Sequence, residues 1–231
     1  MSKPLPLSLS IVIPALNEAA NIVATLTPLQ PIRVRGVEIV VVDGGSADNT
    51  IALATPLCDR VLTTAKGRAL QMNAGASDTK GEVLLFLHAD SILPSNADTT
   101  IQNAITNNKQ WGRFDIHIEG THPMFGVIAW FMNHRSRLTG INTGDQGMFM
   151  TREIFLQAGG FPAQPLMEDV ELSSRLKRIA APICLRQTIT TSGRRWQKHG
   201  LWRTIFTMWR LRLAYFFGAS PTTLHQQYYG H

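Results

Sequence analysis

The sequence predicts an α/β fold with a Rossmann-like, mostly parallel central sheet flanked by helices. Three apolar runs, at 9–14, 37–42 and 82–87, lie within the first ninety residues and are separated by helix-like segments. Each run is continuous rather than alternating, which is typical of strands that helices cover on both faces. The chain has 231 residues, enough for one α/β domain with a sizeable core.

The first half alternates strand-like and helix-like segments. Strands are expected at 9–14, 37–42, 59–63 and 82–87, and helices at 17–29, 48–56 and 67–76. Polar residues follow three of these strands, in the segments Asn17-Glu18, Asp43-Gly44-Gly45-Ser46 and His88-Ala89-Asp90. Because open α/β sheets bind ligands outside the carboxyl ends of their strands, these segments are expected to converge on one crevice.

The second half is less regular. Strands are expected at 111–119 and 147–151, and helices at 122–138, 153–158, 169–179 and 201–217. The sequence shows no internal repeat, low-complexity tract or clear linker. One domain over 1–231 is therefore the economical interpretation.

Charge is distributed unevenly along the chain, whose formal net charge is +6. Residues 1–171 contain 12 of the 22 Lys and Arg and all 16 Asp and Glu, whereas residues 172–231 contain the other ten cations and no acid. A basic segment of this kind indicates an anionic partner, which is a phosphate-bearing substrate, a membrane surface or nucleic acid.

The compartment is indicated by cysteine usage and by the N-terminus. Cys58 and Cys184 belong to no CxxC or Cys/His cluster, so a reducing, cytoplasmic compartment is expected. The first residues resemble no secretory signal, and no run reaches the ~18 apolar residues of a membrane span.

Asp43-Gly44-Gly45 is a candidate nucleotide contact. The chain has neither a GxGxxG fingerprint nor a P-loop. An aspartate at a strand end can accept a hydrogen bond from a base N–H, and glycines let the backbone approach a ligand. An ordinary turn after a strand is the alternative.

His88-Ala89-Asp90 is a candidate cation site. Alternate residues of an extended segment point the same way, so His88 and Asp90 are placed to share a divalent cation whose other ligands come from a diphosphate. A strand-end histidine capped by a neighbour is the alternative.

Glu168-Asp169 begins an expected helix. Acidic residues in a first turn complement the helix dipole, which is a purely structural explanation. The functional interpretation is a carboxylate that removes a proton from an acceptor hydroxyl.

Taken together, these motifs and their spacing resemble glycosyltransferase family 2, and within it a short bacterial branch that ends in a Trp/Arg-rich segment. The resemblance extends from about residue 8 to residue 220. It is carried by the segments 10–18, 41–50, 67–75, 85–91, 144–146 and 168–172.

The resemblance implies a GT-A fold, with a nucleotide-sugar half at about 8–110, an acceptor half at about 111–200 and a basic amphipathic helix at about 201–217. The donor implied is a nucleoside-diphosphate sugar. Its implied contacts are Pro14, Asn17, Glu18, Asp43, Gly44, Gly45, Arg68, Asn73, Ala89, Asp90 and Arg195. The implied contacts of the acceptor or of the donor sugar are Gly144, Asp145, Gln146 and Glu168.

The resemblance also implies a divalent cation, manganese or magnesium, and an inverting mechanism with Asp169 as the base. Asp90 matches the second aspartate of the family's Asp-x-Asp motif, whereas His88 replaces the first. Imidazole is a softer ligand than carboxylate, which leaves metal strength and identity open. His199 is a further candidate ligand, with a solvated basic loop as the alternative.

The expected helix at 201–217 fits a membrane interface, and a lipid or polyprenol acceptor would follow from that position. Such an enzyme would be cytoplasmic and peripheral on the inner face of the plasma membrane. Of the three anionic partners named above, nucleic acid becomes the least favoured. Arg212 lies opposite Arg203 and interrupts a clean apolar face. A core-packing helix with snorkelling arginines is the alternative.

Two other functions compete with this interpretation. A sugar nucleotidyltransferase would have a similar α/β domain, but its glycine/arginine-rich phosphate loop is not visible in the first thirty residues. A non-catalytic membrane or nucleotide adaptor would use the basic segment alone.

Overall fold

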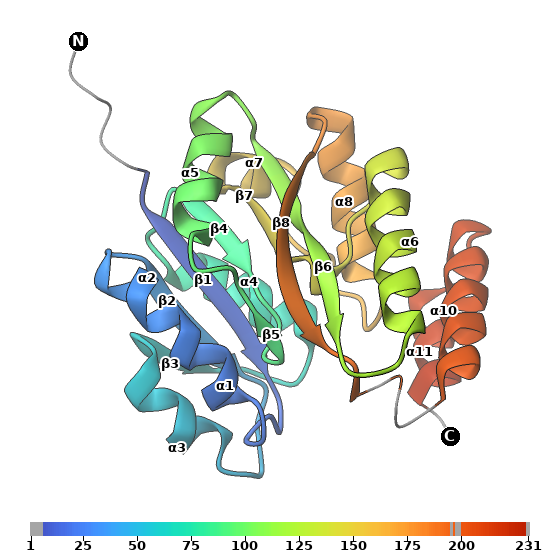
Figure 1. Cartoon of the computed structure of the whole chain (residues 1–231), viewed down its shortest axis with the longest axis horizontal. Helices are drawn as coiled ribbons and strands as arrows, with labels where there is room; N and C mark the ends of the chain where they lie inside the picture. Colours follow the sequence, from blue (N-terminus) through green and yellow to red (C-terminus); the bar gives the residue numbers. More distant parts are fainter. Residues whose placement is uncertain (1–6, 195, 197–199, 230–231) are drawn as a thin grey trace.

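A central mixed sheet runs through the whole computed structural model, which describes residues 7–194, 196 and 200–229. Figure 1 shows this sheet with helices packed against it. The strand order is β3-β2-β1-β4-β7-β6-β8-β5. The strands are β1 (Leu9–Ala15), β2 (Glu38–Asp43), β3 (Arg60–Thr63), β4 (Val83–Phe86), β5 (Ser91–Ile92), β6 (Trp111–Glu119), β7 (Met148–Thr151) and β8 (Ile183–Ser192).

The first four strands are parallel, as the continuous apolar runs predict. β1 pairs with β2 and β4, and β2 pairs with β3. Ile11, Val12 and Ile13 are fully buried, and they point alternately into two cores on opposite faces of the sheet. A strand buried on both faces has no polar side, which explains why its sequence does not alternate.

Each core is closed by its own set of helices. The first core contains residues of α1 (Ile22–Leu26), α2 (Gln30–Val34), α3 (Thr50–Ala54) and α5 (Ala97–Thr106). The second contains residues of α4 (Arg68–Asp78), α7 (Arg152–Gln157) and α8 (Glu168–Ile179). The helix expected at 17–29 is wrong in its extent, because Asn17 has a positive φ of 54° and α1 begins only at Ile22. Pro28 and Pro31 then divide the rest into a 3-10 turn and α2.

The second half continues the same sheet with mixed directions. β7 is antiparallel to β4 and β6, while β8 is parallel to β6 and antiparallel to β5. Four elements were not predicted from the sequence: β5, α5, β8 and α11 (Pro221–Tyr229). β8 is the largest omission. It combines the buried Leu185 and Ile189 with a polar middle and a register shift opposite Phe114/Asp115, so its alternation is interrupted.

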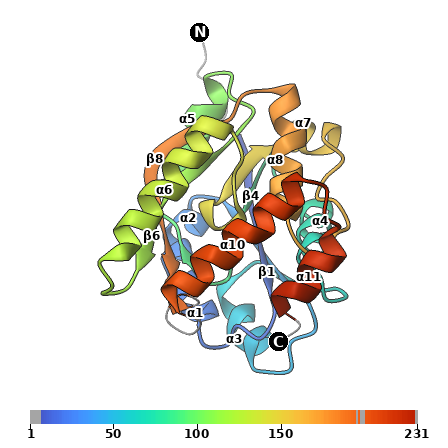
Figure 2. The same cartoon turned by 90° about the vertical axis from the view of Figure 1, so that its right-hand side faces the viewer.

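Three helices lie together on one side of the molecule, as Figure 2 shows: α6 (Met124–Thr139), α10 (Leu201–Phe216) and α11. Leu211 of α10 and Leu224 of α11 are buried against Met167, the residue that precedes α8. The C-terminal helices are therefore packed against the turn that leads into Glu168-Asp169. In the described part of the chain, no helix is long and apolar enough to cross a bilayer.

Candidate active site

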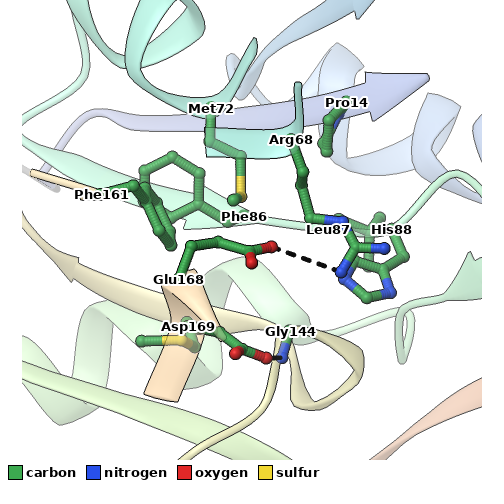
Figure 3. Close-up of a pocket in the computed structure, with 11 residues that line it drawn as sticks. Pro14, Arg68, Met72, Phe86, Leu87, His88, Gly144, Phe161, Glu168 and Asp169 are labelled. Atoms are coloured by element: carbon green, nitrogen blue, oxygen red, sulfur yellow. Dashed lines mark hydrogen bonds and ion pairs between the residues drawn. The ribbon is translucent and has the colours of Figure 1, made fainter. Parts of the chain in front are cut away.

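A small pocket lies beside the carboxyl ends of β1 and β4, where the parallel strands meet the second half of the chain. Figure 3 shows its side chains. Both halves of the chain contribute to its wall, and His88 is the lining residue that comes from the predicted strand-end segments. The lining residues are Pro14, Arg68, Met72, Phe86, Leu87, His88, Gly144, Met148, Phe161, Glu168 and Asp169.

Asp43, at the end of β2, is fully buried and holds the turn that follows it. Its Oδ2 accepts hydrogen bonds from the backbone N–H groups of Gly45 and Ser46, each at 2.8 Å, and its Oδ1 accepts one from the Ser46 hydroxyl. Gly45 has a φ of 89°, which favours glycine. A carboxylate has about four acceptor positions, so most of those on Asp43 serve the turn.

The loops after β1 and β2 are tied to each other. The Asn17 N–H donates to Ser46 Oγ at 2.8 Å, and Asn17 Oδ1 accepts from the Ala47 N–H at 2.9 Å. The Glu18 N–H donates to Thr50 Oγ1 at 2.8 Å. The polar segments predicted at these two strand ends therefore form a single hydrogen-bonded unit.

Asp90 and Glu18 converge on one cation. Arg194 Nη2 lies 3.3 Å from Asp90 Oδ2 and 3.3 Å from Glu18 Oε2. Hard divalent cations prefer carboxylate oxygens of this kind, so a guanidinium occupies a place whose chemistry suits such an ion. Two carboxylates alone do not complete a site. The described residues contain no group of three or more His, Cys, Asp and Glu able to hold a metal.

Asp169 is oriented by the Gly144 turn. Its Oδ2 accepts from the Gly144 N–H at 2.7 Å, and its Oδ1 accepts from the Val170 N–H at 2.7 Å. Figure 3 shows Asp169 facing Gly144 below Glu168. A Cβ at Gly144 would collide with Nε2 of His88, so any larger residue would force the imidazole to move. His88 thus packs against the turn that holds Asp169.

Glu168 and Arg68 form an ion pair at the pocket wall, with Arg68 Nη1 3.5 Å from Glu168 Oε1. Burial, followed by the negative charge of Asp169, raises the pKa of the Glu168 carboxyl above its usual range. Burial lowers the pKa of Arg68, but nearby carboxylates, led by Glu168 and Asp169, outweigh it and leave the pKa above the ordinary value. Perturbed groups of this kind gather at functional sites.

Several predicted site residues have clear structural partners. The Asn73 amide donates to Phe161 O at 2.8 Å and accepts from the Phe161 N–H at 2.9 Å. Gln146 is buried and bonds Ser136 Oγ at 3.0 Å, while Thr143 Oγ1 donates to Asp145 Oδ1 at 2.5 Å. Ala89 is buried, and its carbonyl accepts from Thr25 Oγ1. Arg195 and His199 lie outside the described residues.

Sequence reasoning missed two polar residues near the site. Gln71 of α4 donates to Ala15 O and Val42 O, each at 2.8 Å, and so ties together the ends of β1 and β2. Arg135 of α6 has buried Nε and Nη2 atoms with no hydrogen-bond partner in the described part of the chain. Burial lowers its pKa, against the attraction of Asp145 and Asp169. Arg135 lies seven residues after the buried Ile128, so helical spacing places both on the inward side of α6, and this was the available signal.

Comparison with known proteins identifies relatives of the chain. The model of "Glycosyl transferase family 2" matches residues 10–157. A structure of TarS 1-349 from S. aureus superposes with a TM-score of 0.65 at 16% identity, covering 80% of this chain and 60% of that one. The mannosyltransferase PcManGT from Pyrobaculum calidifontis, in complex with GDP-Man and Mn2+, gives 0.64 at 20% identity, covering 91% and 62%.

A third structure is glucosyl-3-phosphoglycerate synthase from Mycobacterium tuberculosis, in complex with Mn2+, uridine diphosphate and phosphoglyceric acid. Its TM-score is 0.58 at 18% identity, with 80% of this chain and 69% of that one covered. At these identities the likeness shows the fold alone. The chain spans about 60% of the length of TarS 1-349 and of PcManGT. No curated protein sequence matched significantly.

Proposed function

The chain belongs to glycosyl transferase family 2, and on this premise we propose that it moves a sugar, with inversion, from a nucleoside-diphosphate sugar to a hydroxyl group of a lipid-linked acceptor. That it is a nucleotide-sugar-dependent glycosyltransferase of the GT-A type follows from the family and the fold. The finer proposal is carried by one observation. Asp169 is fixed by the Gly144 N–H at a pocket that also receives the ends of β1 and β4.

The donor is proposed to lie across the ends of β1, β2 and β4. The loops that carry Asn17, Glu18 and Asp43 are hydrogen-bonded to each other or within themselves before any ligand binds. Binding a nucleoside there would therefore lose little conformational entropy. Arg68 is partly exposed beside the pocket and carries the fixed charge that a diphosphate requires. Arg195 is proposed as a second phosphate contact.

A divalent cation is proposed at Asp90, with Glu18 as the second carboxylate and His88 and His199 as further candidate ligands. The convergence of two carboxylates on Arg194 supports this position. A bound cation would supply electrostatic stabilisation of the diphosphate leaving group. Manganese accompanies two of the similar structures, and magnesium is the other candidate.

Asp169 is proposed as the general base. Its two oxygens each accept one backbone N–H, which fixes its orientation while lone pairs remain for an acceptor hydroxyl. Gly144, Asp145, Gln146 and Glu168 are proposed to line the acceptor and donor-sugar side. Because the Gln146 side chain is buried and donates to Ser136 Oγ, we expect it to shape this side of the site rather than to bind a sugar hydroxyl.

The donor site is tested by thermal stability in the presence of UDP, GDP and dTDP sugars, with Mn2+ or Mg2+. A ligand that binds only the native state raises the free energy of unfolding by about 2.7 kcal/mol at one hundred times its Kd. We expect one nucleotide to stabilise the protein with metal, and Asp90→Asn to lose most of that effect. Glu153→Gln, on an exposed helix turn, is the matched control and keeps it. No stabilisation by any of these species would overturn the proposal.

A further inference from the structure

The outward side of α10 is a stripe of large apolar side chains. Leucine, phenylalanine and tryptophan recur there at helical spacing, and each side chain is between 60% and 82% exposed. An exposed apolar patch of this kind marks a contact with another body rather than a solvated surface. The members of the stripe are Trp202, Phe206, Trp209, Leu213, Phe216 and Phe217.

The stripe lies opposite the side of α10 that packs on the protein. At about 100° per residue it spans an arc of roughly 100°, while the buried Thr204 and Leu211 lie across the helix. Arg203 and Arg210 border one edge of the stripe, and Arg212 borders the other. Arg212 therefore does not interrupt the apolar side but places a cation on its far margin.

α6 extends this surface. Leu201 and Ile205 of α10 pack against the hydrophobic cluster that α6 forms with β6, and Figure 2 shows both helices on the side turned toward the viewer. Val127, Trp130 and Phe131 of α6 are exposed, and Trp130 stacks on His134 with ring centroids 4.0 Å apart. Neither helix contains an Asp or Glu. The cations beside the stripe are Arg203, Arg210 and Arg212 of α10, because Arg135 of α6 has buried nitrogens and Arg137 pairs with Asp115 of β6.

We propose that the surface formed by α6 and α10 binds a lipid bilayer that contains anionic headgroups. Tryptophan and phenylalanine insert at the boundary between headgroups and acyl chains, and flanking arginines bind lipid phosphates. A second copy of the chain is a poor occupant, because two such surfaces would bring the arginines of one α10 against those of the other, and neither helix carries an acid. The proposal deepens the proposed function and rests on it for the lipid-linked acceptor.

The position of α10 connects this surface to the pocket. Leu211 packs beside Met167, and Tyr215 Oη donates to Glu171 Oε2 at 3.2 Å, so α10 is fixed to the first turn of α8. That turn carries Asp169. A bilayer bound to α10 would therefore hold its lipids at a fixed distance from the proposed base, which suits an acceptor that never leaves the membrane.

Flotation with vesicles tests the surface in the absence of any substrate. We expect the full chain to bind vesicles of phosphatidylcholine and phosphatidylglycerol in a 3:1 ratio, with at least tenfold weaker binding to pure phosphatidylcholine. The triple variant Trp202→Ser/Phe206→Ser/Trp209→Ser should lose binding to both. Arg203→Glu/Arg210→Glu should lose the preference for anionic vesicles, by roughly fivefold for each charge removed and more for reversal.

Matched changes on other surfaces provide the controls. Val34→Ser on α2 and Lys109→Glu after α5 alter exposed residues away from α6 and α10, and these variants should float like the parent protein. Thermal stabilisation by a nucleotide, measured without vesicles, reports the donor site separately. Failure to float with retained nucleotide binding would overturn only the membrane proposal. A dimer in solution that the triple variant dissociates would also overturn it, in favour of a second copy.

Discussion

The proposed donor side, at the end of β2, and the proposed acceptor side, at the start of α8, differ in how their buried charges are hydrogen-bonded. After β2, the buried Asp43 carboxylate receives three hydrogen bonds from its own turn. Across the pocket, Glu168 is buried with a raised pKa, and Arg135 has two buried nitrogens without hydrogen-bond partners in the described chain. The buried carboxylate of the donor side therefore has its hydrogen bonds satisfied. On the acceptor side, the buried charges of Glu168 and Arg135 are poorly solvated and lie close to the proposed base.

This difference indicates that the two sides have different roles, ligand binding on one and reactivity on the other. A satisfied scaffold binds a ligand without first rearranging, and poorly solvated charges near a reacting atom act more strongly than charges in water. Changes at Asp43 and its turn should therefore mainly affect stability. Changes on the acceptor side should mainly affect reactivity and pH dependence.

Asp169→Asn should have the largest effect on the acceptor side. Asparagine can still accept the Gly144 N–H, so the fold should remain, but it cannot take a proton. We expect initial rates of sugar transfer to fall by about 10²- to 10⁴-fold, the usual contribution of a general base. The melting temperature should change little, and Glu153→Gln should retain full rates. A variant with parental rates would remove Asp169 from catalysis and restore the adaptor hypothesis.

Asp43→Ala should have the largest effect on the donor side. The change leaves the N–H groups of Gly45 and Ser46 and the Ser46 hydroxyl without their acceptor, which should lower the free energy of unfolding by about 2 kcal/mol. Urea denaturation measures this loss, and Asp43→Asn should show an intermediate value because one amide oxygen remains. If Asp43→Ala lowered the free energy of unfolding as little as Glu153→Ala on the exposed turn of α7, the hydrogen bonds of Asp43 would not stabilise the donor side.

Glu168→Gln should change the pH dependence of stability. The folded state raises the pKa of this carboxyl, so the native protein binds its proton more tightly than the unfolded chain does. Parental stability should therefore fall as pH rises from about 4.5 through the raised folded-state pKa. The variant lacks this loss, so it should be more stable than the parent at neutral pH, and the difference should vanish toward pH 4. Urea midpoints from pH 4 to 8 test this, and a pH-independent difference would contradict it.

Arg194→Gln should have the smallest effect, because its ion pairs with Glu18 and Asp90 are partly exposed. Removing a guanidinium from the proposed cation position should tighten Mn2+ binding by about two- to fivefold, as ion pairs of this kind contribute up to ~1 kcal/mol. Electron paramagnetic resonance of free Mn2+ measures the affinity. Arg186→Gln makes the same change of charge on an exposed part of β8 and should leave it unaltered. Weaker Mn2+ binding in Arg194→Gln would show that Arg194 does not compete with the ion.

The parallel half of the fold was predictable because its elements depend on local sequence. Continuous burial demands continuous apolar runs, and β1, β2 and β4 lie where those runs lie, while the partly exposed β3 lies at its β-branched segment. β8 was not predictable in the same way. Its polar middle becomes a strand through pairing with β6, which lies more than sixty residues away in sequence. Such long-range pairing produces no alternating pattern in the sequence of β8 itself.

The sequence by itself determined the order of β1 to β4, the residue types at their ends and the family motifs that contain Asp43, Asp90 and Asp169. Each of these depends on local spacing or on matched residues. The tertiary structure alone decided that Arg194 meets Glu18 and Asp90, that the Gly144 turn orients Asp169, and that the apolar stripe of α10 faces outward. These contacts join residues distant in the chain, and only packing determines which of them meet and how deeply each charge is buried.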